Sequence, residues 1–273
     1  MIEDVESIET NPIQSEANLI LGPHPSEAHP FGILAADDTL TQSGIPHRAL
    51  NEVKPFSRDA IVTYMRKKLL HHHVSLEMLE AMKHLGLEAE QSRMSSFPID
   101  PSTRKGNLAE VFLAEYLISA SNVDLPIYRL RYNTNPNQSM KGDDVLAFDL
   151  DSDPVRIIVG ESKFRSTPSK RDVINIVDGL LRSYRGGIPV SLQFIAARLF
   201  DAGKEELATK VLNCSVLFAQ EKLQLDYVGL LMGDLKSTQR INDHTDDSLH
   251  RLAMISFNIN DPGSIIDQCF QNL

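Results

Sequence analysis

Hydrophobic and polar residues alternate through the middle of the chain in a pattern typical of a β-hairpin. The segment from Lys141 to Arg165 reads KGDDVLAFDLDSDPVRIIVGESKFR, and Asp151-Ser152-Asp153-Pro154 has the composition of a tight turn. Two apolar runs flank this turn, and each continues into charged residues at its far end. The pattern predicts strands over Asp143–Leu150 and Val155–Lys163.

The register of this hairpin gathers charges at one end of an apolar face. With the turn placed as above, Asp149 faces Arg156 as an opposite-charge pair, and Asp144 faces Glu161. Side chains alternate between the two faces of a strand, so one face is apolar along its length and ionic at its end. The apolar part is Leu146, Phe148, Leu150, Val155, Ile157 and Val159, and the ionic end is Asp144, Glu161 and Lys163.

Helical and strand-like segments surround the hairpin. An apolar helix is predicted over Gly106–Ala120 and another helix over Lys170–Tyr184, while residues 190–219 have largely helical character. Further strands are predicted over Leu125–Tyr132, Leu225–Met232 and Leu252–Ile259. This order of elements predicts an α/β fold in which a central mixed sheet is flanked by helices.

The N-terminal third follows no sustained period. Residues 1–55 are rich in Pro, His, Ser and acids, whereas Ser57 and Ser75 are positioned to cap helices that run to about residues 72 and 86. The stretch SSFPIDPSTRKG at 95–106 has the composition of a linker. We therefore expect an acidic, partly helical N-terminal region at 1–95, which is a candidate for docking a partner because it carries no chemistry of its own, and a second domain at 96–273.

Composition describes an ordinary globular chain with an acidic balance. The 273 residues are 42% hydrophobic and carry a formal net charge of -10, which disfavours a protein that coats DNA passively. No apolar run is long enough to span a membrane. Cys214 and Cys269 have no partner spacing, so we expect free thiols and a reducing, cytoplasmic setting.

The ionic end of the hairpin has the chemistry of a metal site. Opposed carboxylates on Asp144 and Glu161 would lie about 4.5–5.5 Å apart at their Cα atoms and would repel each other unless a cation lay between them. A hard divalent ion such as Mg²⁺ or Mn²⁺ would bridge them, with Lys163 beside it to stabilise a phosphate or a water. A register shift of one residue would put Asp143 in place of Asp144, so Asp143 is the alternative acid. Solvated charges at strand ends are the alternative interpretation.

The same residues resemble a known nuclease superfamily. GDD at the start of one strand and ESK at the end of the next, preceded by an acid-bearing helix, are similar to the PD-(D/E)xK pattern, although Gly142-Asp143 replaces the proline of its name. The longer runs KGNLAEVFLAEYL, KGDDVLAFD and VGESKFR resemble the HamA family of the bacterial Hachiman anti-phage system. The resemblance implies a nuclease effector that degrades DNA and is held by a helicase partner, HamB.

The resemblance also assigns roles to individual residues. It implies that Asp144, Glu161 and Glu110 hold the metal and that Lys163 acts at the water or phosphate. Glu110 lies on an apolar helical stripe, where an acid is costly unless paired, and pairing with a nearby Arg or Lys is its alternative role. The proposed assignment makes Glu110, Asp144, Glu161 and Lys163 the catalytic set.

Other residues and functions remain open on the sequence. Arg165, Lys170 and Arg171 are candidate phosphate contacts, or a solvated basic helix start. His71-His72-His73 favours a solvated helix end over a metal site, because consecutive helical residues point in different directions. An RNA nuclease and a non-catalytic subunit that docks and regulates a helicase are the competing functions. Oligomeric state and the trigger of activity are not encoded in any motif.

Overall fold

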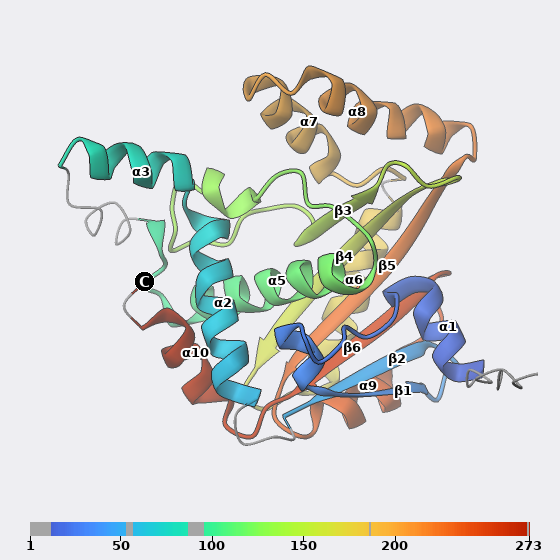
Figure 1. Cartoon of the computed structure of the whole chain (residues 1–273). Coiled ribbons are helices and arrows are strands. Elements are labelled where there is room, and N and C mark those ends of the chain that lie inside the picture. Colours follow the sequence, from blue (N-terminus) through green and yellow to red (C-terminus); the bar gives the residue numbers. More distant parts are fainter. Residues whose placement is uncertain (1–11, 53–56, 87–95, 186, 272) are drawn as a thin grey trace, which may run out of the picture.

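A six-stranded mixed sheet forms the centre of the molecule, with helices on both faces (Figure 1). This computed structural model describes residues 12–52, 57–86, 96–185, 187–271 and 273. The strands are β1 Ala35–Leu40, β2 Pro46–Asn51, β3 Val145–Asp149, β4 Val155–Arg165, β5 Leu223–Gly233 and β6 Leu252–Asn258. The α-helices are α1 Pro12–Leu21, α2 Ser57–His73, α3 Leu76–His84, α5 Pro101–Ala120, α6 Lys170–Arg185, α7 Ser191–Asp201, α8 Glu205–Ala219, α9 Ser237–His244 and α10 Pro262–Phe270. Two short 3-10 helices are η1 Pro30–Ile33 and η2 Arg129–Tyr132.

The sheet combines parallel and antiparallel pairing in the order β1-β2-β6-β5-β4-β3. Strands β4, β5, β6 and β2 are parallel, and the outer strands β1 and β3 each pair antiparallel with their neighbour. The α/β class with a central mixed sheet and flanking helices is therefore confirmed.

The predicted hairpin register is also confirmed. Val145 pairs with Gly160, and Asp149 pairs with Arg156. The side chain of Arg156, however, does not bond to Asp149: its Nε donates to Asp226 Oδ2 on β5 at 2.6 Å. Arg251 also donates to Asp226. The fully buried carboxylate of Asp226 attracts Arg156 more strongly than the half-exposed Asp149 does, because a buried charge is costly without a partner.

The two faces of the hairpin enter different hydrophobic cores. Leu146, Ile157 and Val159 pack with residues of α6, α7 and α8 on one side of the sheet. The alternate residues Val145 and Ile158 pack with α2, α5 and α10 on the other. In Figure 1, α5 lies in front of the sheet, and α6 and α9 lie behind it.

Two strands were not predicted, one predicted strand is absent, and one helix begins earlier than predicted. β1 and β2 lie in the region that shows no period, because β2 reads PHRALN and buries a histidine and an arginine among its apolar residues. The stretch 125–132 was wrongly predicted as a strand. Asp124 forms a single bridge to Phe148, and the chain then turns into η2 after Pro126, which has no N–H for a ladder.

Helix α5 begins within the segment that resembles a linker. Asp100 caps the helix by accepting from the Thr103 backbone N–H at 2.7 Å, and Pro101 occupies the first turn. The helix therefore starts five residues before Gly106. The domain boundary expected near residue 95 falls beside residues 87–95, outside the described residues, and it stays a prediction.

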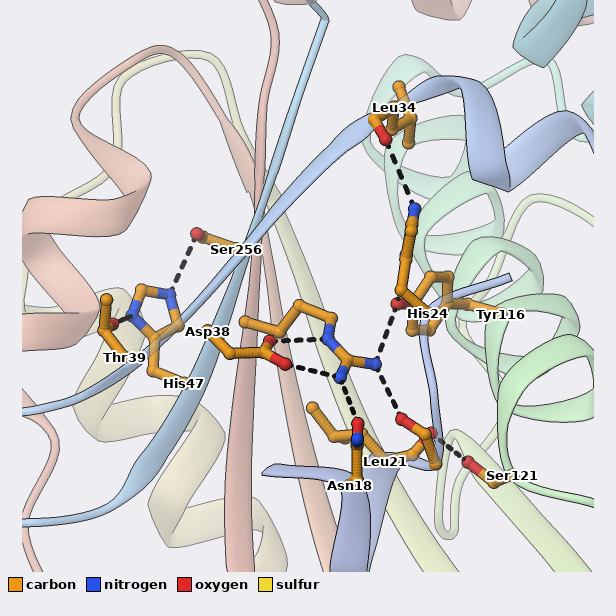
Figure 2. Close-up of polar contacts among 12 residues, drawn as sticks. Asn18, Leu21, His24, Leu34, Asp38, Thr39, His47, Tyr116, Ser121 and Ser256 are labelled. Atoms are coloured by element: carbon orange, nitrogen blue, oxygen red, sulfur yellow. Dashed lines mark hydrogen bonds and ion pairs between the residues drawn. The ribbon is translucent and has the colours of Figure 1, made fainter. Parts of the chain in front are cut away.

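Arg48 joins the N-terminal elements to the rest of the sheet, and Figure 2 labels its partners Asp38, Asn18 and Tyr116. Its buried guanidinium donates from Nε and Nη2 to both carboxylate oxygens of Asp38 on β1, at 2.6 and 2.7 Å. The remaining donors reach Asn18 of α1, the carbonyl of Gly22 and the hydroxyl of Tyr116 on α5. One side chain of β2 thus connects α1, β1 and α5.

Two expectations from composition are also addressed by the structure. Cys214 and Cys269 are both free and buried, as predicted. Among the described residues, no helix has both the length and the apolar character that crossing a membrane requires.

Candidate active site

A cleft of about 600 Å³ opens where β3 and β4 meet α5 and α6. It is lined by Glu110, Asp144, Glu161 and Lys163, so the structure brings the four predicted catalytic residues to one place. They come from α5, from the chain just before β3, and from β4. The apolar face of the hairpin therefore ends in a polar cleft, as its sequence predicts.

Glu161 and Lys163 are placed by the alternation of β4. Both follow Ile157 and Val159 on the face toward α6, and Lys163 Nζ donates to Glu161 Oε1 at 2.8 Å. Gly179 of α6 lies against the carboxylate. A Cβ at that position would approach Glu161 Cδ to 2.7 Å, so the absence of a side chain makes room for the acid.

Glycine also brings the acid-bearing helix close to the hairpin. A Cβ on Gly160 would approach Leu113 Cδ2 to 2.8 Å and Val145 Cβ to 2.9 Å. Without that atom α5 packs directly on β4, and the stripe of α5 that carries Glu110 reaches the cleft.

Asp144 and Asp143 point to different partners. Asp144 Oδ2 accepts from the backbone N–H and the hydroxyl of Ser162, at 2.9 and 3.0 Å. Asp143 accepts from the backbone N–H of Ser191 at the start of α7, at 3.1 Å, and its own N–H donates to the Ser191 hydroxyl. β3 begins only at Val145, so the side-chain alternation of the strand does not extend to these two acids. Asp144 is the acid that acts on the pKa of both Glu110 and Glu161.

Two glutamates of the cleft, Glu110 and Glu161, have pKa values well above the ordinary range. Burial raises the pKa of Glu110 to about 8; the Arg129 guanidinium, 3.3 Å away, opposes the shift, and the charges of Asp144 and Glu161 add to it. Burial and then the charge of Asp144 raise the pKa of Glu161 to about 7, against the lowering effect of Lys163. Loss of contact with water is thus the main reason that both groups hold their protons, and the charge of Asp144 adds to it. The alternative role for Glu110, pairing with an arginine, is also realised.

The three basic candidates divide into one at the cleft and two away from it. Arg165 lines the cleft, and its Nε donates to Asp172 Oδ1 at 2.8 Å. Lys170 and Arg171 are exposed in the first turn of α6 and are not among the described residues that line the cleft.

Sequence reasoning missed two cations of the site. Arg182 of α6 lines the cleft and lowers the pKa of Glu161. Its position three residues after Gly179, on the same helical face, is the signal that would have found it. Arg129 belongs to the segment wrongly predicted as a strand, so its approach to Glu110 left no trace in the pattern.

The histidine run at the end of α2 is not a solvated helix end, and that prediction was wrong. His72 and His73 are buried. His72 Nε2 lies 2.8 Å from Glu115 Oε1, and Lys68 Nζ lies 2.7 Å from Glu115 Oε2. Burial opposes ionisation of Glu115, but the hydrogen bonds from His72 and Lys68 outweigh it and lower the pKa to about 2. These groups form a structural ion cluster between α2 and α5.

The donor set of the cleft suits a hard divalent cation. The charge of Asp144 makes ionisation of Glu110 and Glu161 more costly, which a cation would relieve, and Mg²⁺ takes one or two carboxylates together with waters. In the described part of the chain, no three His, Cys, Asp or Glu side chains lie close enough as they stand to hold one ion together. Asp144 and Glu161 are thus the natural pair of ligands, and Glu110 would join them only by releasing Arg129.

Comparison with known proteins decides the family. A family model described as HamA matches residues 31–273. The chain is also 34% identical over 261 residues to the Hachiman protein HamA of Bacillus cereus, covering 92% of this chain and 93% of that protein. The chain belongs to the HamA family. The match starts before β1, so the HamA region includes the N-terminal strands, and the anti-phage assignment of the sequence resemblance is supported.

Proposed function

We propose that this HamA-family chain is a metal-dependent deoxyribonuclease of the PD-(D/E)xK type that acts in anti-phage defence. The observation that carries the proposal is the meeting of Glu110, Asp144, Glu161 and Lys163 in one cleft. An acid on a helix, an acid opening one strand and Glu-x-Lys on its antiparallel neighbour are the elements of that nuclease pattern.

Asp144 and Glu161 would hold the metal, which when bound polarises a phosphodiester and lowers the pKa of water. Ser162 fixes the Asp144 carboxylate with two hydrogen bonds, so one oxygen is oriented before any ion arrives. The other carboxylate, on Glu161, is seated against Gly179. Contacts with β4 and α6 therefore hold both carboxylates, although Asp144 itself lies in the chain just before β3.

Cations of the cleft would act on the substrate. Lys163 bonds to Glu161 now, and its ammonium is placed to stabilise charge that develops on a phosphate oxygen. Arg182 and Arg165 line the same cleft and would bind the phosphates on either side. Arg165 is held at the cleft by Asp172, which restricts its side chain before the nucleic acid binds.

A restraining partner follows from the same proposal. An unspecific nuclease would damage the DNA of its own cell, so its cleft must be controlled, and the HamA resemblance implies a HamB-type helicase. We propose that the helicase blocks the cleft until it engages DNA. Co-expression with the helicase should yield a joint complex in size-exclusion chromatography and suppress cleavage by the chain, and full cleavage within that complex would exclude the restraint.

The test of the enzyme is direct. Purified protein is incubated with plasmid DNA, single-stranded DNA or RNA, with Mg²⁺, with Mn²⁺ or with a chelator. We expect DNA cleavage that needs the metal and is lost in Glu161→Gln. Metal-dependent cleavage of RNA alone would change the substrate to RNA. Absence of cleavage with every nucleic acid and metal, by protein free of its partner, would leave the docking subunit as the function.

A further inference from the structure

A second, apolar pocket of about 140 Å³ adjoins the catalytic cleft. Leu125, Ile127, Leu146, Phe194 and Ile195 form much of its wall. These residues come from the chain after α5, from β3 and from α7, so the pocket lies between the hairpin and the α7 helix. It shares Glu110 and Asp144 with the proposed metal site, but its lining includes none of the phosphate contacts proposed above.

The pocket and the cleft share a wall. Glu110, Asp143 and Asp144 line both, together with Gly142 and Val190. A group that fills the pocket is therefore a direct neighbour of a phosphate held at the acids. In a nucleic acid, the group attached one sugar away from a phosphate is a base.

The chemistry of the pocket selects a flat, uncharged ring. Arg129 and Lys141 stand beside the acids in its lining, so the polar side favours neither sign of charge strongly, and its apolar wall favours an uncharged surface that leaves water. A cavity of about 150 Å³ lined by apolar side chains holds one benzene, so this pocket has room for a single six-membered ring. A pyrimidine has that size, whereas a purine has a second fused ring.

The polar side of the pocket suits the edge of a base. Arg129 lines it and donates from Nη2 to the carbonyl of Met140 at 3.1 Å. Nη1 of Arg129 is buried and has no hydrogen-bond partner among the described residues. A small shift of this side chain would let a ring carbonyl accept from Nη1, which an aliphatic ligand would not do.

Phe194 supplies an aromatic surface that contacts one neighbouring ring and one guanidinium. Tyr132 meets it edge-on with ring centroids 5.8 Å apart, and the Arg198 guanidinium lies 5.9 Å from its centre. We propose that this pocket receives a pyrimidine base of the nucleotide next to the cleaved phosphodiester. The inference rests on the proposed nuclease function and adds a base subsite to it.

The chain contains no tryptophan, which gives a direct binding test. Phe194→Trp introduces one emitter at the pocket, and Phe200→Trp places the same emitter on the same helix outside it. The probes are thymidine, uridine, deoxyadenosine and deoxyribose, which carry no phosphate and need no metal. We expect thymidine and uridine to quench the fluorescence of Phe194→Trp saturably, at least about tenfold more tightly than deoxyadenosine, and the fluorescence of Phe200→Trp to stay unchanged. Quenching by deoxyribose alone, or equal binding of deoxyadenosine, would overturn the proposal.

A second measurement covers the unmodified pocket. Saturation-transfer NMR should show thymidine bound to the wild-type chain and to Phe200→Ala, with the signal lost in Phe194→Ala. In cleavage, an abasic residue next to the cut bond should slow an oligothymidylate about tenfold or more. Thymidine binding without cleavage of any nucleic acid would reject the nuclease and keep the pocket, whereas cleavage without thymidine binding would reject the pocket alone.

Discussion

Glu110 and Glu115 show how one helix can give two acids opposite properties. Both are buried on α5, but Glu115 contacts two basic side chains, whereas burial of Glu110 is opposed by Arg129 and reinforced by two acidic neighbours, Asp144 and Glu161. The pKa is therefore lowered to about 2 in Glu115 and raised to about 8 in Glu110. An acid that stabilises the fold and an acid that holds its proton lie on successive turns of the same helix.

The raised pKa of Glu110 predicts that the metal-free protein loses stability as pH rises. The folded chain keeps this proton up to about pH 8, whereas the unfolded chain releases it near the ordinary glutamate value of 4.5. The stability that protonated Glu110 contributes to the folded protein is fully present below about pH 4.5 and is lost as pH rises through 8. Glu110→Gln does not titrate in this range, so the Tm of the variant minus the Tm of the wild type should increase by several degrees from about pH 5 to about pH 8.5. Thermal unfolding in chelator measures this difference.

Glu115→Gln is the matched control for that experiment. Its carboxylate is ionised across the same range and bonded to His72 and Lys68, so its removal should destabilise the protein at both ends of that pH range alike. If the difference in Tm between Glu110→Gln and the wild type stays constant across this pH range, Glu110 is already ionised in the folded chain.

Glu161 and Lys163 should be separable by what each does to the metal. Glu161→Gln removes a ligand, so it should lose both cleavage and the rise in Tm that Mg²⁺ produces. Lys163→Ala keeps both carboxylates, so it should retain the Mg²⁺ effect on Tm while cleavage falls about a hundredfold or more. Cleavage at the wild-type rate in Lys163→Ala would remove the lysine from the catalytic set.

At the scale of elements, the hairpin was predictable because its signals are local. A turn of Asp, Ser and Pro and two alternating runs define β3 and β4 with their register, and hence the positions of Glu161 and Lys163. The residues that surround the acids of the site come from α5, α6 and η2. They lie too far away in the sequence for helical or strand periodicity to relate them to the hairpin. Gly179 and Arg129 were missed as site residues for that reason, whereas Arg182 could be found once Gly179 was placed, because the two share one face of α6.

β1 and β2 were also not predicted from the pattern, but for a different reason. The pattern of β2 is broken by His47 and Arg48, and both side chains are buried. His47 bonds to Ser256 on β6, and Arg48 bonds to Asp38 on β1. A strand whose buried positions are satisfied by distant polar groups looks like a loop in a hydrophobicity pattern.

Gly179 supplies a prediction at the level of the helix. Alanine there adds about 1 kcal/mol of helix propensity to α6. Its Cβ, however, would approach Glu161 Cδ to 2.7 Å. Gly179→Ala should therefore keep or raise Tm while cleavage drops about tenfold or more, because the carboxylate must move. Plasmid cleavage and thermal unfolding of the same samples measure both effects.

The control for this helix glycine is Gly263 in α10. A Cβ on Gly263 would meet only Asp261 Oδ1, at an ordinary 3.5 Å, and the residue is not among those that line the cleft. Gly263→Ala should leave cleavage unchanged. Full cleavage by Gly179→Ala would mean that Glu161 is not held in place by α6.

For the whole molecule, the sheet does not divide where the sequence changes character. β2 pairs with β6 in parallel, and β1 closes that edge. The core shared by α2, α5 and α10 includes residues from both sides of position 95, among them Leu50, Met65, Phe112 and Phe257. The segment before residue 55 has the acidic composition of a loop, yet it contributes two strands to the sheet. We therefore expect that removal of the first 95 residues unfolds the chain and does not release a folded domain.

Arg48 tests that view without a truncation. Its guanidinium is fully buried and bonds to Asp38, Asn18, the Gly22 carbonyl and Tyr116, so Arg48→Met leaves the Asp38 carboxylate without its cation. Breaking a buried ion pair from one side costs about 3–5 kcal/mol, and the double variant Arg48→Met with Asp38→Leu should recover part of it. Because β1, β2 and the cleft belong to one sheet, cleavage should be lost at the same temperature as the far-ultraviolet circular dichroism signal. Two separate transitions in Arg48→Met, with cleavage surviving the first, would show instead that the chain after residue 95 folds by itself.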